Sequence, residues 1–236
     1  MFSGSFYADS VDFTFAVVIG VVIFFTLLIT FLLIYFVYKY NHKRNKQAKN
    51  IHGNTPLELT WTLIPLIIVI GIFYMGWTNY EALRNIPKDA MQIRVTGQMW
   101  KWGFEYANGL KTDTLFVPIN KPVKMEFTSN DVNHSFFVPA LRFKTDVIPT
   151  KHNTSWFKAD QLGSMQVQCA EYCGLNHSQM NTMVVVLSDS AYNQWFNEQT
   201  RKMQNTQTDT TKKDTTNINL TNKINTQKDS TIKQQK

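Results

Sequence analysis

Two long runs of apolar residues occupy the first third of the chain, and a different pattern follows them. Residues 13–38 and 59–80 contain no Asp, Glu, Lys or Arg, which gives charge-free runs of 26 and 22 residues. A helix of the first length is about 39 Å long, enough to cross a hydrocarbon core of about 30 Å. We therefore predict two membrane-spanning helices, the second with a kink at Pro65.

A buried helix of a soluble protein and a cleaved signal peptide are the alternative interpretations of these runs. Both runs are apolar all round, and aromatic residues that suit a membrane interface stand near their ends: Tyr35, Tyr38, Tyr40 and Trp77. No Lys or Arg precedes Phe13, and no small-residue cleavage pattern follows the first run, so a signal peptide is not expected. Membrane lipid is therefore an expected partner.

The connection between the two runs is basic. Between positions 39 and 58 it holds one Glu and five Lys or Arg residues, namely Lys39, Lys43, Arg44, Lys46 and Lys49. By the positive-inside rule this loop faces the cytoplasm or its equivalent. We therefore predict a two-pass protein of the inner (cytoplasmic) membrane. Both termini and the domain after the helices are then expected on the periplasmic or intermembrane-space side.

Beyond residue 90 the pattern changes to short β-rich runs separated by turns. The expected strands are residues 91–95, 100–106, 123–127, 135–138, 155–158, 165–169 and 183–187, and Asn108-Gly109 signals a hairpin. Several short strands within about 100 residues indicate a β-sandwich or small barrel. A helix with Ser190 as its N-cap is expected to follow. It would pack on the domain through Tyr192, Trp195, Phe196 and Met203.

Composition and charge divide the rest of the chain. After residue 204 the residues are mainly Thr, Asn, Gln, Lys and Asp, which cannot bury enough apolar surface to fold, so we expect a disordered tail. The predicted domains are residues 1–90 with the helix hairpin, 91–203 with the β domain and its helix, and the tail 204–236. The net charge of +7 comes from the tail and the loop, because residues 91–200 carry nine charges of each sign. Without a clustered basic face, no nucleic-acid partner is expected.

Four potential metal ligands fall within twelve residues, in the segment CAEYCGLNHSQM. Cys169, Cys173, His177 and Met180 have the spacing C-x3-C-x3-H-x2-M. Two thiolates, an imidazole and a thioether form a soft ligand set that suits copper. A disulfide would leave His177 and Met180 unexplained, and a structural zinc site rarely takes Met. Copper is favoured, with the disulfide and zinc as alternatives.

The second cysteine indicates two copper ions, because a mononuclear blue-copper site needs one Cys, two His and a weak Met. In the economical arrangement both sulfurs bridge the ions, with one His on each, Met180 on one and a backbone carbonyl on the other. Of the remaining histidines, His42 and His52 lie on the wrong side of the predicted membrane. His134, in DVNHSFFVP, is favoured over His152, in the turn-like PTKHNTS. Such a centre relays electrons and has no open position for a substrate.

Four segments together resemble subunit II of haem–copper cytochrome c oxidase: CAEYCGLNHSQM, DVNHSFFVPALRFKTDVIP, GQMWKWGFEY and LELTWTLIP. The resemblance runs from the first helix to about residue 187. It implies a cupredoxin-like Greek-key barrel with a dinuclear copper centre, CuA. The ligands that it implies are His134, Cys169, Cys173, His177, Met180 and the main-chain carbonyl of Glu171, and every one of these positions matches in this sequence.

The resemblance also implies a function. The chain would take electrons from cytochrome c and pass them to the haem of subunit I, where oxygen is reduced to water, and subunits I and III would be its partners. Trp100 matches the residue that receives electrons, Glu58 a position associated with a proton channel of subunit I, and the Glu171 side chain a magnesium site at the junction with subunit I. From the residues alone, Trp100 is equally well a packed strand aromatic, and Glu58 a partner of the helix dipole.

A membrane-tethered copper-binding or copper-delivery protein, with no electron-transfer partner, is the alternative function. The quinol-oxidase form of the subunit resembles this chain in fold but lacks the copper ligands, which are all present here. No C-x-x-C-H motif for covalent haem attachment occurs in the sequence, so a separate electron donor is expected.

Overall fold

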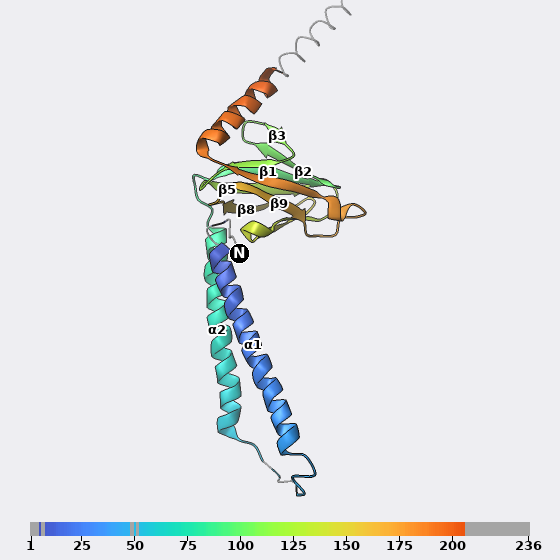
Figure 1. Cartoon of the computed structure of the whole chain (residues 1–236). Helices are drawn as coiled ribbons and strands as arrows, with labels where there is room; N and C mark the ends of the chain where they lie inside the picture. Colours follow the sequence, from blue (N-terminus) through green and yellow to red (C-terminus); the bar gives the residue numbers. More distant parts are fainter. Residues whose placement is uncertain (1–4, 6–7, 48–49, 51, 206–236) are drawn as a thin grey trace, which may run out of the picture.

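The computed structural model describes Ser5, residues 8–47, Asn50 and residues 52–205. A long helical hairpin lies at one end and a β domain at the other, with a further helix beyond the β domain (Figure 1). The predicted disordered tail falls almost entirely on residues 206–236, outside the described residues.

The two apolar runs form helices α1 (Ala8–Lys39) and α2 (Thr55–Arg84), which lie side by side as an antiparallel hairpin (Figure 1). Both are long and apolar enough to span a membrane, and none of the most apolar stretch of either helix is buried. A core helix of a soluble protein would be mostly buried, so that alternative is wrong. Near the β domain, Asn79 Nδ2 donates a hydrogen bond to Thr14 Oγ1 at 3.2 Å and links the two helices.

Two five-stranded sheets make up the β domain in the described part of the chain. The first sheet has the spatial order β3 (Lys111–Thr112), β2 (Lys101–Tyr106), β1 (Met91–Gln98), β5 (Pro122–Ser129) and β8 (Asn153–Lys158). The second has the order β4 (Leu115–Pro118), β10 (Asn181–Leu187), β9 (Gly163–Cys169), β6 (His134–Val138) and β7 (Phe143–Val147). Two short 3-10 helices, η1 (Pro139–Leu141) and η2 (His177–Gln179), complete it.

The strand order confirms the predicted Greek-key β domain. β1 pairs in parallel with β5 and β4 in parallel with β10, whereas the other neighbours are antiparallel. Parallel neighbours need a crossover connection, so the chain passes from one sheet to the other rather than running up and down. In β2 the alternate residues Trp102, Phe104 and Tyr106 are buried between the sheets, where the rings of Phe104 and Phe136 meet edge to face at 6.1 Å.

Three strands, β3, β4 and β7, are not predicted by the sequence pattern. All three lie at the edges of their sheets. β3 has two residues and β4 has four, while β7 exposes Lys144 and Asp146 between its buried ends. Edge strands are kept short or charged because their unpaired backbone would otherwise pair with another chain. β3 and β4 are therefore too short to give a strand pattern, and the exposed charges of β7 interrupt its pattern.

The predicted C-terminal helix covers residues 189–205 and appears in orange in Figure 1. Its packing is as expected, since the Trp195 ring stacks on Phe116 at 4.3 Å and the Phe196 ring lies 5.9 Å from Tyr106. The predicted N-cap is wrong. Ser188 caps the helix instead of Ser190, because its Oγ accepts a hydrogen bond from the Ala191 amide at 3.3 Å.

Candidate metal centre

The predicted ligands come together where β6 and β9, two neighbouring strands of the second sheet, approach the same end of the domain. β9 ends at Cys169, and Cys173 follows in the next loop. His177 is the first residue of η2, and Met180 directly precedes β10. His134 is the first residue of β6, which pairs with β9. The end of β9, the loop that follows it and the start of the adjacent strand β6 therefore supply the whole set.

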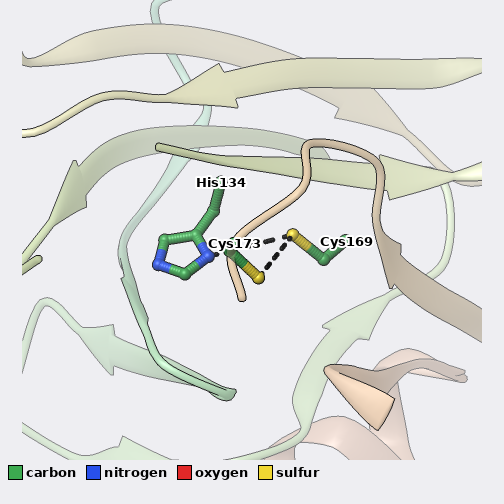
Figure 2. Close-up of side chains that lie close together, drawn as sticks. All are labelled: His134, Cys169 and Cys173. Carbon is green, nitrogen blue, oxygen red and sulfur yellow. Dashed lines mark hydrogen bonds between the residues drawn. The ribbon is translucent and has the colours of Figure 1, made fainter. Parts of the chain in front are cut away.

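Two free sulfur atoms form the middle of the cluster (Figure 2). Cys169 Sγ and Cys173 Sγ lie 3.8 Å apart, well beyond the bond length of about 2.05 Å in a disulfide. The disulfide alternative is therefore wrong. His134 Nδ1 lies 3.8 Å from Cys169 Sγ, while His177 Nδ1 lies 3.4 Å from Cys173 Sγ. The two imidazoles thus approach different sulfurs.

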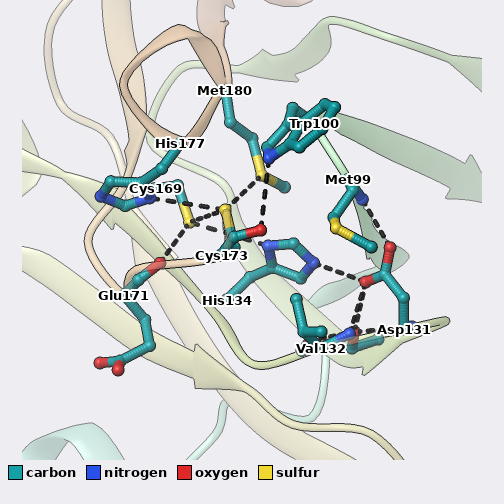
Figure 3. Close-up of polar contacts among 11 residues, drawn as sticks. Met99, Trp100, Asp131, Val132, His134, Cys169, Glu171, Cys173, His177 and Met180 are labelled. Atoms are coloured by element: carbon teal, nitrogen blue, oxygen red, sulfur yellow. Dashed lines mark hydrogen bonds and ion pairs between the residues drawn. The ribbon is translucent and has the colours of Figure 1, made fainter. Parts of the chain in front are cut away.

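Two weaker donors complete the cluster (Figure 3). Met180 Sδ lies 3.8 Å from Cys173 Sγ, and the main-chain oxygen of Glu171 lies 3.3 Å from Cys169 Sγ. Two donors that each bind a tetrahedral ion at about 2.2 Å lie about 3.6 Å apart, so these spacings suit donors gathered around metal ions. Thiolates with a buried thioether favour copper over zinc. The donor set is therefore that of a copper site.

Without a metal ion, two negatively charged thiolates would be unfavourable in this buried cluster. Cys169, Cys173 and Met180 are all buried. Burial, followed by the hydrogen bond and the charge of Cys169, raises the pKa of the Cys173 thiol to about 12. A bound cation would offset this cost, because a metal displaces the thiol proton and compensates the thiolate charge.

Asp131 orients the His134 ring, although sequence reasoning did not identify it. Its Oδ1 lies 2.8 Å from His134 Nε2, so the ring proton sits on Nε2 and the Nδ1 lone pair faces the sulfurs (Figure 3). The Met99 and Val132 amides each donate to the same carboxylate at 2.7 Å. Burial alone would raise the pKa of the Asp131 carboxyl, but its three hydrogen bonds outweigh burial and lower the pKa below its ordinary value. The only sequence signal is its position three residues before His134.

Gly97 is a second residue that sequence reasoning missed. It pairs with Trp102 across β1 and β2, and it lies directly against the His134 ring. A Cβ at this position would lie 3.0 Å from His134 Cδ2 and 3.3 Å from Trp102 Cζ3. Any larger residue would therefore press on the imidazole, which would have to shift by a few tenths of an ångström.

Trp100 was open to two interpretations, an electron-entry residue and a packed strand aromatic, and it lies outside the strand β2. It lies in the turn before β2 and is half-buried, whereas Trp102, two residues later, is in the core. Its Nε1 donates to the main-chain oxygen of Cys173 at 3.3 Å (Figure 3). The same ring passes beside Gly174, where a Cβ would be 3.4 Å from Trp100 Cζ2. The indole therefore lies against the ligand loop and, partly buried, packs on the edge of the core.

The other candidates lie apart from the cluster. His152 is exposed beside β8, and His42 and His52 belong to the loop at the far end of the hairpin. Glu58 lies in the first turn of α2, four residues after the N-cap Asn54, and its Oε1 accepts a hydrogen bond from the Asn54 amide at 3.3 Å. In return, Asn54 Oδ1 accepts from the Leu57 amide at 3.2 Å. This position, an acidic residue in the first turn of the helix, is the one expected of a partner of the helix dipole.

Comparison with known proteins identifies the family. The family model described as "Cytochrome C oxidase subunit II, transmembrane domain" matches residues 3–76, and the model described as "Cytochrome C oxidase subunit II, periplasmic domain" matches residues 109–187. The first match covers most of the helix hairpin and the second most of the β domain. A two-pass membrane segment followed by this domain is therefore the arrangement of the chain.

Individual relatives extend over both parts. The chain is 32% identical over 216 residues to "Cytochrome c oxidase subunit 2" of Cereibacter sphaeroides, which covers 75% of this chain and 71% of the relative. It is 30% identical over 207 residues to "Alternative cytochrome c oxidase subunit 2" of Bradyrhizobium diazoefficiens, which covers 74% of each. Among solved structures, the periplasmic domain of subunit II of cytochrome oxidase of Bradyrhizobium japonicum matches 50% of this chain and 99% of its own, with 30% identity and a TM-score of 0.48. The sequence matches, which span helices and β domain alike, establish that this chain belongs to the cytochrome c oxidase subunit II family.

Proposed function

We propose that the β domain holds the dinuclear copper centre CuA, with Cys169 and Cys173 bridging two copper ions. The observation that carries this proposal is that His134 and His177 approach different sulfurs of an unbonded pair. One His would then bind each ion, with Met180 and the main-chain oxygen of Glu171 as the remaining weak ligands. When bound, such a pair of ions would share one unpaired electron and exchange a single electron with little change in geometry.

The chain's family makes it a subunit of cytochrome c oxidase, an oxidoreductase of the respiratory chain. In the proposed function it accepts electrons from cytochrome c and delivers them to the haem of subunit I, where oxygen is reduced to water. The donor set supports a relay rather than a catalytic site, because six protein donors around two ions would leave no position for a substrate. Subunit III is proposed as a further neighbour in the complex.

Trp100 is proposed as the residue through which electrons reach the copper centre. Its indole is half-buried, and its Nε1 is hydrogen-bonded to the main chain of Cys173. A π-system at the surface that contacts a ligand residue directly offers a short path to the metal. Two exposed apolar side chains, Met99 and Val132, lie near Trp100 and Asp131. An exposed apolar surface of this kind suits contact with a partner protein.

The Glu171 side chain is proposed to bind magnesium together with subunit I. Its carboxylate points away from the sulfurs and is exposed (Figure 3). Mg²⁺ prefers six oxygen ligands, so one carboxylate from this chain would need further ligands from subunit I and water. The main-chain oxygen and the side chain of one residue would then face two different metals.

The basic loop between α1 and α2 is proposed to face the cytoplasm, which places the copper domain on the periplasmic or intermembrane-space side. Glu58 then lies at the cytoplasmic end of α2, where a proton-channel role in subunit I is proposed for it. Its exposed carboxylate, which accepts a hydrogen bond from the Asn54 amide, supports access from that side.

Copper content of the purified oxidase tests the central proposal. We expect two copper ions per subunit II beyond the copper of subunit I, together with a near-infrared band from a delocalised pair. Cys173→Ser should abolish this mixed-valence spectrum, whereas Ser178→Ala, an exposed residue of the same loop, should leave it unchanged. One ion per chain would contradict the dinuclear site. Copper that chelators readily remove, as Cu(I) without a near-infrared band, would instead favour the copper-delivery alternative.

A further inference from the structure

A groove of about 620 Å³ lies at the end of the helix hairpin opposite the β domain. Its apolar wall is formed by three residues of the last turns of α1, namely Leu33, Ile34 and Val37. Its polar rim is formed by Asn41, Lys43 and Arg44, from the start of the interhelical loop. The groove therefore joins an apolar surface to two cations.

The loop turns back toward the helix end, which brings the cations to the groove. The Arg44 amide donates to the Asn41 main-chain oxygen at 2.8 Å, and the Lys43 amide donates to Asn41 Oδ1 at 2.9 Å. The Arg44 guanidinium then stacks on the Tyr38 ring, with its Cζ 3.7 Å from the ring centroid. Stacking holds the guanidinium by its face and leaves its N–H edge available to an oxyanion.

The two cations have no acidic partner within the described residues. None of the ion pairs in that part of the chain includes Lys43 or Arg44. The nearest acid along the sequence after them is Glu58, in the first turn of α2. The charge at the groove therefore matches an anion, and no carboxylate is placed to pair with a choline or ethanolamine headgroup.

We propose that this groove binds an anionic phospholipid, with one acyl chain along the apolar wall and the phosphate at Lys43 and Arg44. The charge-free run ends at Tyr38, so the groove crosses the boundary between hydrocarbon and headgroups. A phosphate accepts paired hydrogen bonds from a guanidinium, and the adjacent ammonium adds a second charge. The site is independent of the copper centre, which lies at the other end of the molecule (Figure 1).

Photo-crosslinking in the intact oxidase tests this proposal. Photoactivatable phosphatidylglycerol and phosphatidylcholine would be compared in one bilayer, with crosslinks located by peptide mass spectrometry. We expect phosphatidylglycerol to label residues 33–44 in preference. The double variant Lys43→Ala/Arg44→Ala should lower the ratio of phosphatidylglycerol to phosphatidylcholine crosslinks about tenfold, because both phosphate contacts are removed. Lys46→Ala, which removes one positive charge outside the groove, should change the ratio less than about twofold.

A second variant distinguishes a specific lipid-binding site from the general attraction of anionic lipids to a basic loop. Tyr38→Leu keeps the net charge and the apolar wall but removes the ring on which Arg44 stacks. The lipid ratio should fall in this variant, while the copper spectrum, as a measure of folding, stays unchanged. Three results would each overturn the proposal. The lipid ratio could stay unchanged in Tyr38→Leu, or it could fall equally in Lys46→Ala and in the double variant. Residues 33–44 could also remain unlabelled because subunit I covers them.

Discussion

Arg142 forms a bidentate ion pair with Asp12, which lies 130 residues earlier in the chain. Its Nε donates to Oδ1 at 2.7 Å, and an Nη donates to Oδ2 at 3.1 Å. Asp12 lies near the start of α1, and Arg142 follows η1 in the β domain. The bond therefore ties the membrane hairpin to the copper domain. A second tie is the β-bridge between Ser5 and Ala159, both of which are buried.

Arg142 holds this position in a left-handed conformation, with φ of 53°. Such a conformation costs a non-glycine residue about 1 kcal/mol, a cost that Arg142→Gly would remove. We predict that Arg142→Gly leaves the melting temperature of the β domain within a few degrees but speeds hydrogen exchange in residues 8–12. Asp12→Asn should have the same local effect. Unchanged exchange in both variants would show that the ion pair does not hold the two parts together.

Loss of the hydrogen bond from His134 to Asp131 should strongly lower the affinity for copper. Asp131→Ala should weaken copper binding about 10- to 100-fold, because the ring loses the partner that fixes its tautomer and orientation. Competition with a chelator, measured on the full chain, checks this. Asp160→Asn, which removes an exposed carboxylate between β8 and β9, serves as the control. Equal affinity in the Asp131 variant and the control would contradict the orienting role.

The close packing of Gly97 on β1 predicts a contrast with Gly103, a glycine of the neighbouring strand β2 that pairs with Thr96. A Cβ at Gly97 would meet His134 Cδ2 at 3.0 Å, whereas a Cβ at Gly103 finds its nearest atom, Thr96 O, at 3.9 Å. Gly97→Ala should therefore displace the imidazole, alter the copper spectrum and destabilise the domain by about 1–3 kcal/mol. Gly103→Ala should leave the spectrum unchanged. Absorption spectra and urea unfolding measure both effects, and identical spectra for the two variants would exclude the close contact.

Replacing Met180 by Leu should change the copper spectrum without changing the copper content. Leu replaces Met with little change in volume, so the buried Met180→Leu variant should lose less than about 1.5 kcal/mol of stability. Both thiolates and both imidazoles remain, so two copper ions per chain are still expected. The loss of the thioether should shift the absorption bands. Met183→Leu, at a partly exposed position on β10, is the matched control, and a spectrum that neither variant changes would remove Met180 from the ligand set.

Local patterns in the sequence were sufficient for the spanning helices and for most of the metal centre. A charge-free run of 26 residues spans a membrane whatever surrounds it, because backbone polar groups in hydrocarbon must pair within the helix. Cys169, Cys173, His177 and Met180 likewise fall within twelve consecutive residues, so their chemistry could be interpreted before the fold was known. His134 was reached only by elimination.

Long-range packing decided the remaining features. The partners of Asp131, Gly97 and Arg142 depend on which strands become neighbours, and Met99, for example, reaches Asp131 from 32 residues away. The turn that takes Trp100 out of the core, and the three edge strands, have no distinct local pattern. The sequence by itself determined which donor atoms are available and on which kind of element they lie. Only the tertiary structure decided how they are oriented, because orientation comes from contacts between segments that are far apart in the chain.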